Sequence, residues 1–183
     1  MSQDPSPLLV RPLAPGDLPA ALAIQSEAYP GALIEDAAVF ASRIEAAGSY
    51  CLAAERDGRL VGYLLAHGWT AGSPPPLGAV IAADTPGEVL YVHDLAVSPA
   101  GRGAGAGRRL VARAFELAAR DGLRTAELIA VAGAADYWRR LGFAEAEAPA
   151  VLAVKVATYG PQARWMTRPI VAPEEPRAPG TFR

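Results

Sequence analysis

The sequence predicts an α+β fold built on a mixed β-sheet, and three observations lead to this prediction. Asp57-Gly58 stands between two apolar runs, 50–55 and 60–67, and is typical of a β-hairpin turn, because such turns need residues that accept positive φ. Residues 88–97 have a strand pattern and run through a glycine-rich loop into a helical pattern. Two further helical patterns precede the hairpin.

The N-terminal elements follow from local signals. Residues 8–13 alternate enough to form a first strand. Pro15 to Asp17 offers a turn and an N-cap for a helix that begins at Leu18. A second helix is expected over 35–47, where apolar residues recur at helical spacing until Gly48.

The second half of the chain continues the mixture. The helix after the glycine loop is closed by Asp121-Gly122, and a strand is expected over 125–131. A short helix over 134–141 stops at Gly142. Residues 151–158 and 162–170 are expected to be a closing antiparallel pair of strands.

One domain over residues 8–171 is the simplest organisation, with loose tails at 1–7 and in the proline-rich segment 172–183. The longest stretch without a charged residue, 60–83, raises the question of a membrane span. Pro74 to Pro76 would break any helix there, so we predict a strand followed by a rigid loop and no membrane partner.

Composition narrows the class of partner. The 183 residues include 17 basic and 19 acidic side chains, a net charge of -2, which argues against a nucleic-acid-coating protein and favours small molecules. The one cysteine, Cys51, cannot form an internal disulfide and is expected to be a small buried hydrophobe. With no secretion leader, a cytoplasmic location is expected. We expect no metal site.

The glycine loop 101–107 predicts a phosphate site. It opens directly onto a helix, so successive backbone N–H groups lie at the positive end of the helix dipole. Arg102, Arg108 and Arg109 suggest a polyanion, because cations in a first helical turn oppose that dipole. A P-loop would need Gly-Lys-Ser/Thr here, and a dinucleotide fingerprint would need an acidic residue within 131–135; neither is present.

The loop resembles motif A of the GNAT superfamily of N-acetyltransferases, with Arg102, Gly105 and Gly107 in an Arg-x-x-Gly-x-Gly pattern. Residues 137–143, Tyr-Trp-Arg-Arg-Leu-Gly-Phe, resemble the second motif of that family. The resemblance implies a mostly antiparallel sheet of about six or seven strands flanked by about four helices. It also implies that strand 88–97 splays from strand 125–131.

The resemblance implies acetyl-coenzyme A as cosubstrate. The strand backbone would pair with its pantetheine arm, the loop would hold its pyrophosphate, and the N–H of Leu95 would polarise the thioester carbonyl. The residues implied in binding are Leu95, Ala96, Val97, Arg102, Gly103, Ala104, Gly105, Ala106, Gly107, Arg108 and Trp138.

Acetyl transfer to an amine needs a base, because few amine molecules are neutral near pH 7. Plain alternation places His93 on one face with Tyr91, Leu95 and Val97, so we rank His93 first, with Glu35, Asp94 and Glu88 as reserves. The alternative is a strand histidine bonded to a nearby carbonyl.

The leaving thiolate could take a proton from an acid on the second motif. Trp138 stands where many relatives have tyrosine, and an indole cannot deliver that proton. Either the neighbouring Tyr137 is the acid or the thiolate leaves without help.

Tyr29, Glu35, Trp69 and Tyr91 are expected to line the acceptor pocket, with His67 and the loop 70–86 near it. The sequence therefore predicts direct acetyl transfer to a primary amine of a small molecule or peptide, by a monomer or homodimer. A non-catalytic acyl-coenzyme A sensor or scaffold of the same fold is the alternative. A nicotinamide-dependent oxidoreductase is a weaker third interpretation.

Overall fold

The computed structural model describes residues 6–171, and a seven-stranded mixed sheet forms its centre. The strand order is β1-β2-β3-β4-β5-β7-β6, and every neighbouring pair is antiparallel except β4 and β5. The predicted C-terminal tail, 172–183, lies outside the described residues, and so do residues 1–5 of the predicted N-terminal tail. The strands are β1 (Leu9–Pro12), β2 (Leu52–Arg56), β3 (Arg59–Trp69), β4 (Val89–Val97), β5 (Thr125–Ala130), β6 (Ala144–Glu145) and β7 (Arg164–Pro169). The α-helices are α1 (Leu18–Ala28), α2 (Ala37–Glu45), α3 (Ala106–Arg120), α4 (Ala135–Arg140) and α5 (Ala150–Ala157).

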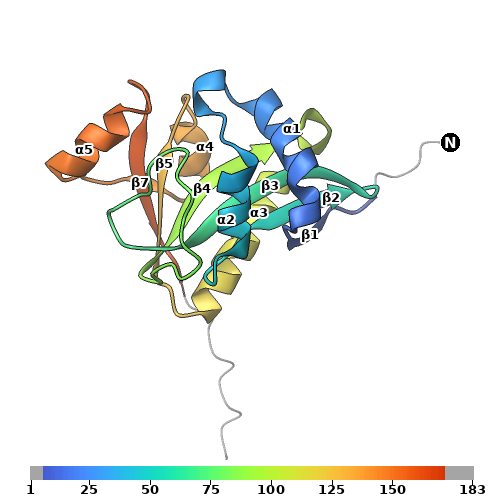
Figure 1. Cartoon of the computed structure of the whole chain (residues 1–183), viewed down its shortest axis with the longest axis horizontal. Helices are drawn as coiled ribbons and strands as arrows, with labels where there is room; N and C mark the ends of the chain where they lie inside the picture. The colour runs from blue at the N-terminus through green and yellow to red at the C-terminus, as the bar shows by residue number, and fades with distance from the viewer. Residues whose placement is uncertain (1–5, 172–183) are drawn as a thin grey trace, which may run out of the picture.

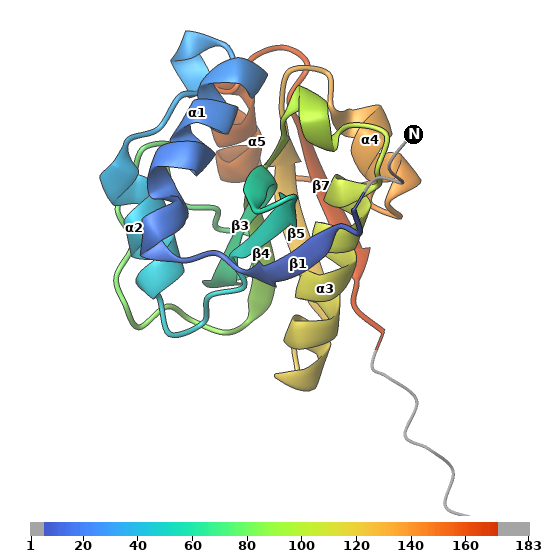
Figure 2. The same cartoon turned by 90° about the vertical axis from the view of Figure 1, so that its right-hand side faces the viewer.

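Helices cover both faces of this sheet (Figure 1). Figure 2 shows α3 and α4 on one side and α1, α2 and α5 on the other. The apolar stripe of α3, including Leu110 and Ala114, packs with Leu64 and Leu90 of the sheet. On the opposite face Phe40 of α2 lies in a second cluster, which also holds Cys51 as a buried thiol. The mixed α+β prediction is confirmed, and so is the burial of Cys51.

The hairpin prediction is also confirmed. Asp57 and Gly58 both have positive φ, 52° and 70°, as a tight turn between β2 and β3 requires. The uncharged stretch 60–83 forms most of β3 and the loop after it. Over residues 6–171, no helix combines the length and the apolar character that a membrane crossing would need.

The prediction of a strand over 151–158 is wrong, because these residues lie in the helix α5. Leu152 and Val156, four positions apart, are buried, whereas Val151 and Val154 are 85% and 70% exposed. That is the burial pattern of a helix, and Pro149 precedes its first turn. The valines suggested a strand, but the i, i+4 burial decided the structure. β7 pairs instead with β5 and with the two-residue β6.

A β-bulge in β4 changes which side chains share a face. Leu65 of β3 pairs with Asp94 and Ala66 pairs with Val92, so His93 is an extra residue without a partner across the ladder. Leu95 therefore packs towards α3, on the same face as Val92. The expectation that His93 shares a face with Leu95 and Val97 is wrong, because it assumed unbroken alternation.

The parallel pairing of β4 with β5 is short. It joins Leu90 to Ala126 and Tyr91 to Glu127, while β4 continues along β3 as far as Val97. Beyond Tyr91 the edge of β4 that faces β5 has no ladder, and we call this opening the splay. It confirms the predicted divergence of the two strands and leaves backbone donors and acceptors free for a ligand.

Candidate functional site

The glycine loop places unpartnered donors at the start of α3. Gly103 and Gly105 have φ of 75° and 72°, in the left-handed region that glycine adopts without strain. The first intrahelical bond runs from the N–H of Arg109 to the carbonyl of Gly105, 3.0 Å apart. The three N–H groups before it have no carbonyl within the helix, and neither a side-chain cap nor an acidic residue occupies this first turn. The loop can therefore hold a phosphate.

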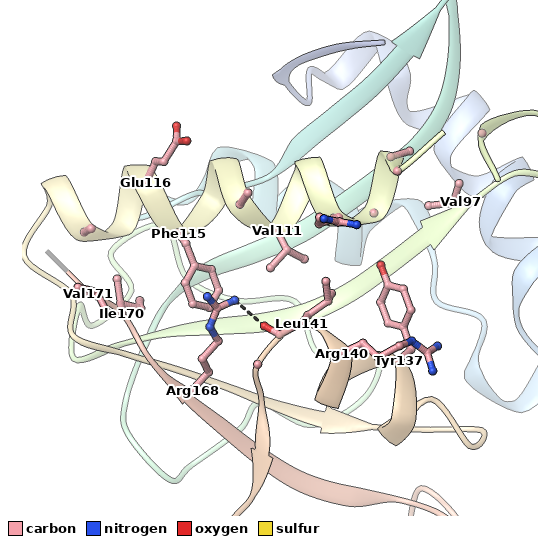
Figure 3. Close-up of a pocket in the computed structure, with 18 of the residues that line it drawn as sticks. Val97, Val111, Phe115, Glu116, Tyr137, Arg140, Leu141, Arg168, Ile170 and Val171 are labelled. Atoms are coloured by element: carbon pink, nitrogen blue, oxygen red, sulfur yellow. Dashed lines mark hydrogen bonds between the residues drawn. The ribbon is translucent and has the colours of Figure 1, made fainter. Parts of the chain in front are cut away.

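An arginine-rich cleft of about 1110 Å³ continues from this loop along α3 (Figure 3). Five arginines and one glutamate line it, so it suits a polyanion. These charged residues are Arg102, Arg108, Arg120, Arg140, Arg168 and Glu116. Sequence reasoning found Arg102 and Arg108 but missed the others. Arg168 could not be found, because it reaches the cleft only through the pairing of β7 with β5, where its Nη1 donates to the carbonyl of Leu141 at 2.6 Å.

The aromatic pair of α4 divides between cleft and core. Tyr137 lines the cleft with its hydroxyl toward the first turn of α3 (Figure 3), and burial raises its pKa. Trp138 is buried and packs against Phe143 and Tyr137. The expectation that Trp138 lines the coenzyme site is wrong, because the short helix turns its indole into the core.

Leu95 touches both sides of the splay. Its side chain lies on the α3 side, and its carbonyl accepts a 2.9 Å hydrogen bond from the Tyr29 hydroxyl on the other side. The N–H and C=O of one strand residue point to the same edge, so the N–H of Leu95 also faces the splay. Val97 lines the cleft, whereas the side chain of Ala96 is buried on the α2 face.

A buried chain of polar side chains joins α2 to the bulge of β4. Arg43 donates from Nη1 to the carbonyls of Val39 and Ala79, and its Nη2 lies 3.4 Å from Nδ1 of His93. A guanidinium can only donate, so Nδ1 accepts and Nε2 of His93 carries the proton. That Nε2 lies 2.6 Å from Oε2 of Glu35, and these two side chains are 5% and 3% exposed. His93 is thus bonded to a carboxylate and a guanidinium, not to a carbonyl.

Glu35 is held from its backbone outward. Buried Gln25 exchanges two 2.9 Å hydrogen bonds with the main chain of Glu35. The N–H of Gly78 donates to Oε1 of Glu35 at 2.6 Å. Burial alone would raise the pKa of Glu35, but the hydrogen bond from His93 and the nearby positive charge hold this pKa below its usual value. Glu35 therefore remains an anion near neutral pH.

Asp94, on the same side of the sheet, has the opposite electrostatic environment. Its Oδ2 accepts from the hydroxyl of Tyr63 at 2.5 Å. Burial raises the pKa of Asp94, although the neighbouring hydroxyls of Tyr29 and Tyr63 act against this rise. Two nearby carboxyl groups with pKa values shifted in opposite directions are typical of sites that divide charge stabilisation from proton transfer.

These groups surround a small inner pocket of about 50 Å³ beside the splay. Its lining residues are Tyr29, Leu33, Glu35, Leu77, Tyr91, His93, Asp94, Ile129, Val131 and Tyr159. Tyr29, Glu35 and Tyr91, which the sequence predicted to lie together, all line this pocket, and the bulge adds His93 to it. Tyr159 was missed, because the sequence placed it in the connection between the expected strands 151–158 and 162–170.

Three other expected residues lie away from this pocket. Trp69 was expected beside Tyr29 and Glu35 but does not line the inner pocket, and its indole donates to the carbonyl of Ser73. His67 is buried beside Trp69. Burial lowers the pKa of His67 to about 3, so its imidazole stays neutral. Glu88 accepts from the N–H of Ala71 in the loop after β3.

The mixed sheet has a splayed parallel pair, with an arginine-rich cleft at a helix start on one face and an ionisable pocket on the other. This arrangement suits an enzyme that transfers a group between two substrates. The sequence profile of the acetyltransferase (GNAT) family matches residues 18–143, and the chain belongs to this family. It is therefore an acyltransferase.

Solved structures agree with this fold. Ard1 from Thermoplasma volcanium is 14% identical, with a TM-score of 0.67 over 90% of this chain and 98% of that one. The ribosomal-protein-S18-alanine N-acetyltransferase from Escherichia coli is 20% identical, with a TM-score of 0.65 over 93% and 99%. Rv2747 from Mycobacterium tuberculosis, solved in complex with CoA and NLQ, is 18% identical, with a TM-score of 0.65 over 89% and 99%. At these identities the likeness shows the fold. No curated protein matches the chain in sequence.

Proposed function

We propose that the protein transfers an acetyl group from acetyl-coenzyme A to a primary amine of a small molecule or peptide, by direct attack within a ternary complex. The observation that carries the proposal is the splay, which separates a phosphate-binding cleft on the α3 face from an ionisable pocket on the α2 face. The fold neighbour Rv2747 was solved with CoA, and the Escherichia coli neighbour is named for acetylating an alanine of a protein.

The cleft fits the cosubstrate in shape and charge. Pyrophosphate oxygens would accept from the N–H groups of the loop 103–107, and Arg102 and Arg108 would neutralise them. The free edge of β4 from Leu95 to Val97 would pair with the amide-bearing pantetheine arm. The reactive carbonyl would then lie at the splay, where the Leu95 N–H could donate to its oxygen.

The amine would approach from the inner pocket. Glu35, an anion held on both oxygens, would attract the ammonium form. The ammonium must lose one proton before its nitrogen can attack, and we assign the acceptance of this proton to Asp94, directly or through one water. The second proton leaves the nitrogen for water as the amide forms. His93 was ranked first as the base, but Nδ1, the nitrogen that would have to accept the proton, faces the Arg43 cation. We therefore assign His93 to positioning Glu35.

The carbon–sulfur bond breaks as the new amide forms. The thiolate that leaves would receive its proton from Tyr137, whose hydroxyl lies near the start of α3 and close to Leu95. Since a thiol is a fair leaving group, this proton lowers the barrier without being indispensable.

Two measurements test the proposal against its alternatives. We expect saturating acetyl-coenzyme A to raise the unfolding temperature of the full chain by about 5–11 °C at 100 times its Kd, with NADH giving no shift. We also expect thiol release when a primary amine is added. Binding without thiol release across an amine panel would leave the sensor or scaffold function, and a shift with NADH would support the oxidoreductase.

A further inference from the structure

A second cavity lies over the inner pocket, and we call it the acceptor vestibule. Its volume is about 640 Å³, in the usual range for pockets that enclose a whole small ligand. It shares Leu33, Leu77 and Tyr159 with the inner pocket, so the two cavities meet. The vestibule is lined by Pro30, Ala32, Leu33, Pro76, Leu77, Ala132, Lys155, Thr158, Tyr159, Gly160, Pro161 and Gln162.

Four separate segments build the vestibule. One follows α1, a second is the proline-rich loop after β3, a third is Ala132 in the connection from β5 to α4, and the fourth runs from the end of α5 toward β7. α5 lies on the same side of the sheet as α1 and α2 (Figure 2). The misassigned segment 151–158 therefore contributes a wall of the acceptor side. Lys155 joins two of the walls, because its Nζ donates to the carbonyl of Pro74.

The chemistry of the vestibule differs sharply from that of the inner pocket. Prolines, leucines and alanines dominate its wall, and among these lining residues Lys155 is the one charged side chain and no carboxylate is present. The carboxylates Glu35 and Asp94 lie beneath, in a pocket of only about 50 Å³. One amine on a narrow stem can fit there, while a second cation would have to sit against apolar walls beside Lys155.

We propose that the acceptor is a monoamine on an apolar body: its amine enters the inner pocket on a short stem and its body fills the vestibule. The proposal rests on the proposed acetyl transfer and names the substrate class of that site. Polyamines and other polycations are excluded by the same arrangement, because the wall offers them no counter-charge. The apolar body belongs either to a free small molecule or to the N-terminal residues of a peptide.

The test compares three acceptors with the full chain and acetyl-coenzyme A, following thiol release. The probes are 2-phenylethylamine, leucyl-phenylalanine amide and spermidine. We expect kcat/KM for at least one apolar probe to exceed that for spermidine by about a hundredfold. The apolar probe that reacts better identifies the free or the peptide source. Spermidine equal to or better than both apolar probes would overturn the proposal while leaving acetyl transfer intact.

A matched pair of variants tests whether the preference for apolar monoamines arises in the vestibule. Leu77 is 40% exposed at the rim, so Leu77→Glu places a carboxylate in the wall without disturbing the core. It should lower the ratio of apolar-probe to spermidine kcat/KM by about tenfold or more. Val151→Glu adds the same charge to exposed α5 outside the lining and should leave the ratio unchanged. Equal effects of both variants would overturn the assignment of the vestibule.

A binding measurement tests the vestibule independently of acetyl transfer. Calorimetry of 2-phenylethylamine and of the dipeptide amide with the coenzyme A complex should show saturable binding of at least one probe, which Leu77→Glu weakens and Val151→Glu does not. If that pattern appears without thiol release from any amine, acetyl transfer fails and the vestibule stands. If neither apolar probe binds or reacts, the vestibule assignment is overturned.

Discussion

The Tyr137 hydroxyl lies directly over Gly107, where a Cβ on Gly107 would overlap its oxygen. Cδ2 of Leu95 lies 3.6 Å from the position that this Cβ would occupy. The phenol, the start of α3 and the splayed strand therefore converge on one point. Glycine at this position therefore makes room for the proposed acid as well as for phosphate.

Tyr137→Phe removes the proposed acid and keeps the ring. We expect kcat to fall by about ten- to a hundredfold with the KM for acetyl-coenzyme A almost unchanged, because the proton is needed only as the thiolate leaves. Trp138→Phe, one residue along and buried in the core, should lower the unfolding temperature but change kcat little. Full activity in the Tyr137 variant would mean that the thiolate leaves unaided.

Gly105→Val tests the phosphate loop. Valine in a backbone with φ of 72° is strained, so the loop should rearrange and the thermal shift caused by acetyl-coenzyme A should disappear. Gly72→Val introduces comparable strain at φ of 64° in the loop between β3 and β4 and should keep the full shift. Retained affinity in the Gly105 variant would remove the loop from the site.

The pH dependence of kcat/KM distinguishes the two proton acceptors. Asp94→Asn should lower kcat/KM and remove the acidic limb of the profile, because a raised pKa brings Asp94 closer to the working pH. His93→Gln can still donate to Glu35 and should keep that limb at a reduced rate. The reverse result would restore His93 as the base.

Glu35→Gln should make the free energy of unfolding depend less on pH in the acidic range. The folded-state pKa of Glu35 lies below the usual 4.5, so its ionised form stabilises the fold above that pH. This contribution is lost as the pH falls below about 4.5 through the lowered pKa. The free energy of unfolding, measured by urea titration, should drop by about 1.5–3 kcal/mol at pH 7 in the variant. The gap from the unmodified protein should narrow toward pH 3, and a constant gap would contradict this role.

Ala132 holds φ of 50° where β5 ends, a conformation that costs a residue with a side chain about 1–2 kcal/mol. Ala132→Gly should therefore stabilise the protein by up to about 1 kcal/mol, since glycine loses part of the gain through its freer unfolded chain. Ala153→Gly, in the exposed interior of α5, should instead destabilise by about 0.5–1 kcal/mol. Calorimetric unfolding of both variants measures the difference.

Local signals predicted the parts of the fold that depend on a few neighbouring residues. Asp57-Gly58 identified the hairpin, and Arg102 and Gly105 identified the glycine loop that opens α3 and lines the cleft. The position of Trp138 depends on how a short helix rotates against the core, which its sequence does not encode locally. In the same way α5 was misjudged because only its packing shows that Leu152 and Val156 are the buried positions.

The inner pocket was predictable only where local signals mark its residues. Tyr29 and Glu35 were found as polar or aromatic residues near helix ends, but the partners that fix their roles lie far along the chain. Arg43 reaches His93 across 50 positions, and Arg168 reaches the carbonyl of Leu141 across 27. Such contacts arise only when the sheet assembles.

The bulge in β4 decides which substrate each side chain of this strand faces. With His93 present, Val92 and Leu95 reach one face although they are three positions apart. If the same residues paired without the bulge, plain alternation would turn Leu95 and Val97 toward the amine and Asp94 toward the coenzyme. Deleting His93 would also remove the bulge but would leave these faces as they are. Side chains along this strand can be exchanged one at a time, whereas straightening the strand at constant length would exchange the two substrates' sides.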